Sequence, residues 1–160
     1  MFDLRRLFLG WRAGRSDSGE VQEEPQKEIR LLAITADIEN EIELRRMAGD
    51  NGWRIVSARS SEEAVAALES QEYALVICDR DLPGEDWREV LSRLTSLSQR
   101  RCILLASPVA DEYLWNEVIQ HRGYDVVTKP YRYDELKRAI TFAGSWAGRP
   151  ENHRREAASR

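Results

Sequence analysis

The feature that most constrains the fold is a regular alternation of short apolar runs with segments of helical periodicity. The runs are rich in strand-forming residues, and most of them lack the polar alternation of a strand that faces water. They lie at residues 29–35, 53–58, 73–79, 102–107 and 124–129. Because strands and helices alternate strictly, the sequence predicts a doubly wound α/β fold, a parallel sheet with helices on both faces.

Local signals mark where the intervening helices begin. Asp37 follows the first run as a candidate N-cap, and Ser60 with Glu63 forms a capping box before the second helix. The apolar positions of the first helix are Ile38, Ile42 and Met47. The later helices are predicted from apolar spacing, at Trp87, Val90, Leu91 and Leu94, over residues 111–120, and at Leu136, Ala139, Ile140 and Ala143.

Composition separates one compact region from polar ends. Residues 1–15 are basic and amphipathic, and residues 16–28 are acidic and poor in apolar groups, as in a flexible linker. Residues 29–146 are long enough for a single domain with its own core, and residues 147–160 form a polar tail.

Charge and special residues exclude several function classes. Lys and Arg number 24 and Asp and Glu 28, a net charge of −4 that gives no electrostatic footprint for nucleic acid. No run of about 20 apolar residues is present for a membrane span. Cys78 and Cys102 lack CxxC spacing, which predicts buried, reduced thiols in a cytosolic protein. His121 and His153 lie far apart without accompanying ligands, so no zinc site is indicated.

Four of the predicted strands end in residues that can carry chemistry. These residues are Thr35-Ala36-Asp37, Asp79, Ser107 and Lys129. Carboxyl ends of parallel strands meet at one edge, where folds of this class bind ligands, so we expect the side chains to converge. Asp79 can attack phosphorus, Lys129 can neutralise phosphoryl oxygens, and Ser107 can donate a hydrogen bond to an acyl phosphate. Taken singly, Lys129 is also explained as a strand-end cation and Ser107 as a turn residue.

With these residues in place, the chain resembles the receiver domain of bacterial two-component response regulators over residues 29–143. The resemblance rests on LVICDRDLPGED around Asp79, LLAS ending at Ser107, and VVTKPYRYDEL around Lys129. It implies a flavodoxin-like sheet of strand order 2-1-3-4-5, and phosphoryl transfer to Asp79 from a phosphohistidine on a partner kinase. It also implies Mg²⁺ at the acceptor, and repacking of the fourth helix, fifth strand and fifth helix on phosphorylation. Such a domain is not an enzyme in the usual sense.

The resemblance is incomplete where the family holds its metal. The two acids that usually end the first strand are Thr35 and Ala36 here, and neither offers a carboxylate to Mg²⁺. Asp79 and the backbone carbonyl of Asp81 remain as metal ligands. Asp37 can substitute for a lost acid if its loop bends; the alternative is a plain helix N-cap.

Two further departures concern the switch and the acidic loop. The aromatic residue expected three positions before Lys129 is Val126, so Tyr124, on the same side of the strand, becomes a switch candidate together with Ser107. Trp87 stands where the family favours Gly. Its indole is expected either to pack over the loop or to cover a partner surface.

Together these observations predict a cytoplasmic, single-domain response regulator that is slowly or weakly phosphorylated on Asp79. Its partners would be a histidine kinase or phosphotransfer protein and a downstream protein target, since no DNA-binding domain follows the last helix. The alternative is a phosphorylation-independent receiver that acts as a docking module. An unrelated enzyme on the same fold ranks third, because no further acid–base pair or cofactor loop is found.

Two segments offer further contacts. Residues 1–12 place four apolar side chains on one helical face, Leu4, Leu7, Phe8 and Trp11. We expect this segment to lie on an anionic membrane surface, to dock in a partner groove, or to stay disordered. In the fourth helix, Tyr113 and Trp115 are either exposed contact residues or part of the core.

Overall fold

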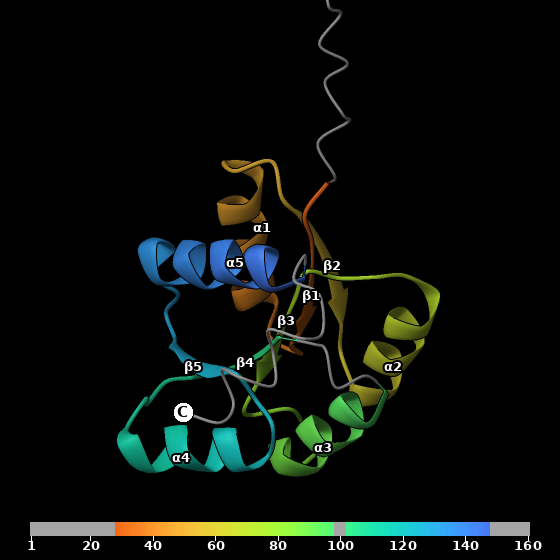
Figure 1. Cartoon of the computed structure of the whole chain (residues 1–160), viewed down its shortest axis with the longest axis vertical. Coiled ribbons are helices and arrows are strands. Elements are labelled where there is room, and N and C mark those ends of the chain that lie inside the picture. The colour runs from red at the N-terminus through yellow and green to blue at the C-terminus, as the bar shows by residue number, and fades with distance from the viewer. Residues whose placement is uncertain (1–27, 98–101, 148–160) are drawn as a thin grey trace, which may run out of the picture.

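A computed structural model describes residues 28–97 and 102–147, which form a five-stranded parallel sheet between two layers of helices (Figure 1). The strands are β1 (Arg30–Ile34), β2 (Arg54–Ala58), β3 (Leu75–Asp79), β4 (Ile103–Ser107) and β5 (Asp125–Thr128). Their order is β2-β1-β3-β4-β5, and each neighbouring pair is parallel. The predicted fold class and strand order are confirmed.

Five helices connect the strands and continue after the last one. They are α1 (Ile38–Gly49), α2 (Ser61–Ser70), α3 (Trp87–Leu97), α4 (Glu112–Gln120) and α5 (Tyr133–Ala147). Helices α1 and α5 lie on one face of the sheet, and α2, α3 and α4 lie on the other (Figure 1).

Two hydrophobic clusters hold these layers together, one on each face of the sheet. Side chains of β3 alternate between them: Leu75 and Ile77 join the α1 and α5 cluster, whereas Val76 and Cys78 join the other. Every residue of β3 and β4 is buried. Because both faces of the central strands are covered, their sequences are apolar until the last residue, where Asp79 and Ser107 interrupt the pattern.

The predicted helix starts are also confirmed. Asp37 caps α1 by accepting a hydrogen bond from the backbone N–H of Glu39 at 2.9 Å. Ser60 caps α2 by accepting from Glu63 N–H at 3.2 Å. Asp111 caps α4 in the same way. These caps satisfy N–H groups that have no partner within their own helices.

Two apolar positions of α1 are placed differently from a buried helix face. Met47 is buried together with Leu44 and Ala48, but Ile38 and Ile42 are 58% and 61% exposed. Successive residues of a helix are rotated by about 100°, so Ile38 and Ile42 project from the side of α1 opposite to the buried Leu44, Met47 and Ala48. The isoleucines near the first turn therefore face outward.

Trp87 is buried, so the prediction that it covers a partner surface is wrong. Its ring meets His121 edge-on at a centroid distance of 5.8 Å. The guanidinium of Arg88 lies 4.5 Å above the indole and binds Glu117 of α4 through two oxygens. The first residue of α3 is thereby enclosed between its own helix and the end of α4.

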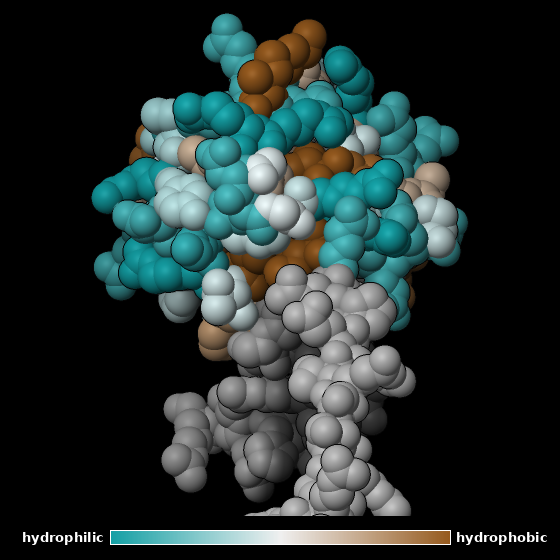
Figure 2. All heavy atoms as spheres, turned by 90° about the horizontal axis from the view of Figure 1, so that it is seen from above, coloured by the Kyte–Doolittle hydropathy of each residue, from teal (hydrophilic) through white to brown (hydrophobic). Residues whose placement is uncertain are grey.

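The surface seen from above is mainly hydrophilic, with apolar atoms gathered between the polar ones (Figure 2). Tyr113 and Trp115 of α4 are both exposed, so these two rings are not part of the hydrophobic core. Within the described ranges, none of the helices has the length and apolar character needed to cross a bilayer. The predicted amphipathic segment at residues 1–12, most of the linker and the polar tail lie outside the described residues.

Candidate functional site

Asp79 is the centre of the site. It is the last residue of β3, the central strand of the sheet, and its carboxylate is almost completely buried. The chain then turns away through Pro83 and Gly84, whose positive φ of 74° favours glycine. A buried carboxylate requires charged or hydrogen-bonding partners, since desolvation would otherwise disfavour the ionised form.

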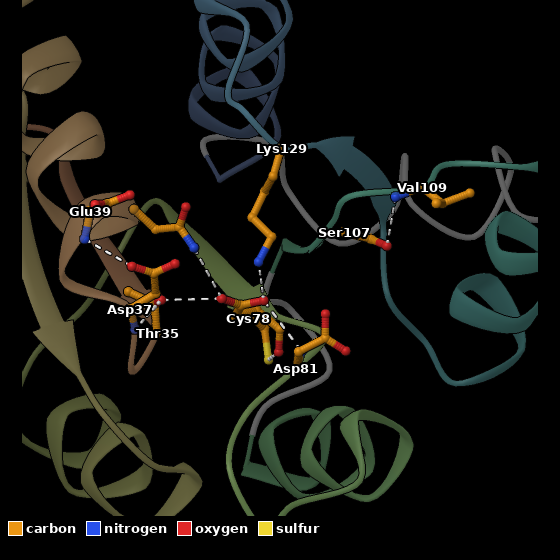
Figure 3. A network of polar contacts seen from close by, with 10 residues as sticks. Thr35, Asp37, Glu39, Cys78, Asp81, Ser107, Val109 and Lys129 are labelled. Atoms are coloured by element: carbon orange, nitrogen blue, oxygen red, sulfur yellow. Dashed lines mark hydrogen bonds and ion pairs between the residues drawn. The ribbon is translucent and has the colours of Figure 1, made fainter.

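Lys129 supplies the charge partner. Its Nζ lies 2.6 Å from Oδ1 of Asp79, and the two side chains are only 13% and 4% exposed (Figure 3). The lysine follows β5, where its backbone N–H donates to the carbonyl of Ser107 at 2.9 Å. The following peptide bond, to Pro130, is cis. The predicted meeting of this acid and this amine at the sheet edge is observed.

Two neutral donors hold the other oxygen of Asp79. Thr35 donates its hydroxyl to Oδ2 at 3.2 Å, and the side-chain amide of Asn40 donates to the same atom at 3.4 Å. The backbone N–H of Asp81 adds a bond to Oδ1 at 3.2 Å. A carboxylate has about four lone-pair positions, and four donors are therefore aimed at this one.

Asn40 was missed by the sequence reasoning, although a signal was present. The helix that starts at Asp37 begins beside the carboxyl ends of the strands, and Asn40 lies in its first turn. A polar side chain at that place points back toward the sheet edge.

Ser107 shares the sheet edge but makes no hydrogen bond with Asp79. It is completely buried at the end of β4, and its hydroxyl accepts a hydrogen bond from Val109 N–H at 3.3 Å. In Figure 3 the dashed contact of Ser107 runs to Val109, apart from the dashed contacts of Thr35 and Lys129. The structure thus joins Asp79 and Lys129 directly, and it leaves Ser107 one strand away with its own proton uncommitted.

The candidate switch residues occupy separate environments. Val126 is buried within the cluster on the α2–α4 face. Tyr124 lies just before β5, is partly exposed, and stacks on Phe142 of α5 with ring centroids 5.3 Å apart. Desolvation of its hydroxyl raises the pKa of Tyr124 above the ordinary value.

Two other ionisable groups near Asp79 are held neutral. Burial raises the pKa of the Cys78 thiol strongly, and the negative charge of Asp79 adds to the effect. Burial also raises the pKa of Tyr131, again with a contribution from Asp79. Neither group therefore adds a charge beside the buried ion pair of Asp79 and Lys129.

Comparison with known proteins assigns the chain to a family. The response regulator receiver domain matches residues 23–141. The chain belongs to the response regulator receiver family. A receiver domain is normally a non-catalytic signalling module of two-component systems, and the chain carries that signalling fold.

Among curated relatives, this receiver is 26% identical over 133 residues to the virulence sensor protein BvgS of Bordetella bronchiseptica. It is 28% identical over 85 residues to the C4-dicarboxylate transport transcriptional regulatory protein DctD of Rhizobium meliloti. These matches cover 79% and 53% of this chain, but only 11% and 18% of the relatives. The receiver thus spans less than a fifth of either protein.

Similar solved structures show the same fold. A signal receiver domain of an HD domain-containing protein from Pseudomonas fluorescens matches with a TM-score of 0.68 at 22% identity, covering 81% of this chain and 93% of that one. The co-crystal structure of the Saccharomyces cerevisiae phosphotransfer protein Ypd1 with the receiver domain of Ssk1 matches with a TM-score of 0.69 at 16% identity. That match covers 78% of this chain and 94% of the other.

Receiver domains typically bind Mg²⁺, but the donor set of this receiver does not fit that ion. Mg²⁺ takes oxygen ligands in near-octahedral geometry and relies on carboxylates. At the end of β1, Thr35 directs a proton at Asp79, and Ala36 has no polar atom. The carboxylate of Asp37 accepts the N–H of Glu39 at the start of α1. In the described part of the chain, no group of three or more His, Cys, Asp or Glu side chains is arranged to hold a metal.

Proposed function

We propose that this receiver accepts a phosphoryl group on Asp79 from a phosphohistidine of a histidine kinase or phosphotransfer protein, and signals through protein contacts. The observation that carries the proposal is the buried pairing of Asp79 with Lys129 at the carboxyl edge of the central strand. A nucleophilic carboxylate beside a lysine ammonium suits phosphoryl transfer, because the ammonium can neutralise charge on the phosphoryl oxygens. The similarity to the Ypd1–Ssk1 complex supports a phosphotransfer protein as partner.

The transfer step uses residues of this chain and one group of the partner. A carboxylate oxygen of Asp79 attacks the phosphorus of a phosphohistidine whose other ring nitrogen is protonated. The P–N bond breaks and its electron pair stays on the ring nitrogen, so a neutral imidazole leaves. Of the four hydrogen bonds at Asp79, that of Asn40 is the longest, at 3.4 Å, so Oδ2 is the oxygen most easily freed. The product is an acyl phosphate on Asp79 and a free imidazole on the partner.

Lys129 and Ser107 then have distinct roles toward the new phosphoryl group. The Lys129 side chain moves so that its ammonium pairs with a phosphoryl oxygen in place of the carboxylate. The buried negative charge thus remains compensated. Ser107 only accepts a hydrogen bond in the unphosphorylated state, from Val109, so its hydroxyl proton is available to the phosphate. A rotation of Ser107 toward Asp79 would break the Val109 contact and transmit the change to the loop before α4.

The direct test is a phosphodonor assay read by intact mass. Acetyl phosphate or phosphoramidate should add about 80 Da to the protein, and the adduct should be missing in Asp79→Asn. Borohydride reduction of the acyl phosphate, followed by peptide mapping, should place the modification at Asp79. A wild-type protein that stays unmodified with both donors and with a phosphohistidine protein contradicts the proposal.

A second candidate is a docking module that works without phosphorylation. It is favoured by the four donors already aimed at Asp79, which stabilise the pocket without an added group. For such a module, partner affinity should be the same in wild type and in Asp79→Asn. For a phosphorylated receiver, the phosphodonor should change that affinity in wild type alone.

A further inference from the structure

We infer that the Asp79 pocket works without a divalent cation, because Thr35 and Asn40 fill the position from which a cation would bind the carboxylate. The inference concerns the occupancy of Oδ2 of Asp79. It concerns the unphosphorylated carboxylate and does not depend on whether Asp79 accepts a phosphoryl group, so it can be tested separately from the proposed function.

The Thr35 hydroxyl donates its proton toward Asp79 and so cannot offer a lone pair to a cation there. The Thr35 hydroxyl accepts a hydrogen bond from the backbone N–H of Asp37 at 3.1 Å. Its single proton is directed to Oδ2 of Asp79 at 3.2 Å. Because an ionised carboxylate can only accept, Thr35 presents a positive hydrogen to Asp79, whereas a metal ligand would present a lone pair to a shared ion. Thr35 is itself buried, which limits its freedom to turn away.

Hydrogen-bond donors already saturate the carboxylate of Asp79. Asn40 donates to Oδ2 beside Thr35, while Lys129 and the N–H of Asp81 donate to Oδ1. A carboxylate has about four lone-pair positions, so these four donors occupy all of them. A cation on Asp79 would have to displace at least one donor and bring its own positive charge close to the others.

The charge of Asp79 is already balanced by Lys129. The side chains that line the buried end of the pocket carry one negative charge on Asp79 and one positive charge on Lys129. Thr35, Ala36 and Asn40 are neutral. A pocket with two more carboxylates would need a divalent ion to offset them, whereas this pair is already neutral. The neutral residues Thr35, Ala36 and Asn40 therefore remove the negative charge that a divalent cation would otherwise have to balance.

The test is a metal titration of the full chain, followed through amide NMR signals. Mn²⁺ broadens signals of nuclei near its binding site, and Mg²⁺ competes for the same site. We expect no saturable, Mg²⁺-competable broadening at Asp79, Asp81 or Asn40 up to about 20 mM Mg²⁺, far above the range in which a specific site fills. Selective broadening of these amides that Mg²⁺ reverses anywhere within this range overturns the inference.

A gain-of-function variant tests whether the β1 residues are responsible. Ala36→Asp, and Thr35→Asp combined with Ala36→Asp, should bind Mg²⁺ at least tenfold more tightly than wild type. Adding Asp79→Asn to either variant should remove the gain. Ala36 is half-buried at the end of β1, so the single variant is expected to fold, and thermal melting checks this. Folded variants that still bind no Mg²⁺ overturn the inference, because the exclusion would then have another cause.

A phosphodonor assay with and without EDTA separates this inference from the proposed function. An adduct that forms in EDTA supports both. An adduct that forms only with Mg²⁺ overturns the inference and leaves the proposed function intact. No adduct in either condition, together with no metal binding, overturns the proposed function and supports the inference.

Discussion

Lys129 donates to Asp79 across a separation of 50 residues, and the two atoms that meet are 2.6 Å apart at the carboxyl edge of the sheet. The contact reaches across β4, which lies between β3, ending at Asp79, and β5, which ends just before Lys129. It is the one ion pair of the described residues in which both side chains are less than a fifth exposed.

Breaking the pair from one side should destabilise the fold. Lys129→Met leaves a buried carboxylate without its charge partner, a change that typically costs about 3–5 kcal/mol in unfolding free energy. Adding Asp79→Asn removes the uncompensated charge and should recover a large part of that loss. Urea unfolding of the two single variants and the double variant measures the coupling. A double variant that merely adds the two single losses contradicts the pairing.

Thr35 should act on stability through its hydroxyl. Thr35→Val keeps the side-chain shape but deprives Oδ2 of Asp79 and the N–H of Asp37 of a partner. We expect a loss of about 1–3 kcal/mol in unfolding free energy. Thr35→Ser retains the hydroxyl and is the matched control, with a smaller loss. A loss in Thr35→Ser that equals or exceeds the loss in Thr35→Val would contradict the prediction, because the methyl group would then contribute at least as much as the hydroxyl.

Trp87 and Tyr113 should differ sharply, although both are aromatic residues in helices next to the site. Trp87 is buried between α3 and the end of α4, so Trp87→Ala should lower the free energy of unfolding by about 3–5 kcal/mol. Tyr113 is 72% exposed, and Tyr113→Ala should change stability by less than about 0.5 kcal/mol. Chemical denaturation compares them directly. A large loss in Tyr113→Ala would place that ring in a packed environment.

The two cysteines should be unreactive in the folded protein. Burial raises the pKa of Cys102 to about 12, and burial raises that of Cys78 further. In the unfolded chain thiols ionise near pH 8.5, so stability contributed by the protonated thiols is present below about pH 8.5 and is lost as pH rises toward 12.

Iodoacetamide labelling at pH 8, followed by mass spectrometry, measures this protection. We expect almost no label in native protein and two labels after denaturation in urea. The variants Cys78→Ala and Cys102→Ala should each remove one label under denaturing conditions. Rapid double labelling of the native protein would show that the thiols are accessible.

The sequence by itself determined the elements and their edge. Apolar runs alternating with helical spacing identify strands and helices, because a buried strand and a one-sided helix each need a characteristic local pattern. Caps such as Asp37 and Ser60 are local as well, since the bond closes within a few residues. Strand ends share one edge in any doubly wound sheet, so the sequence alone placed Asp79 and Lys129 on the same rim.

Only the tertiary structure decided which of these residues touch. Asn40 enters the pocket because α1 starts beside β3. The Ser107 hydroxyl instead accepts a local hydrogen bond, from the backbone N–H of Val109. Ile38 and Ile42 face outward although they are apolar, and Trp87 is enclosed although it starts a helix at a loop. Periodicity is a property of neighbours along the chain, whereas contacts across 39 to 50 residues depend on how the crossovers seat each helix on the sheet.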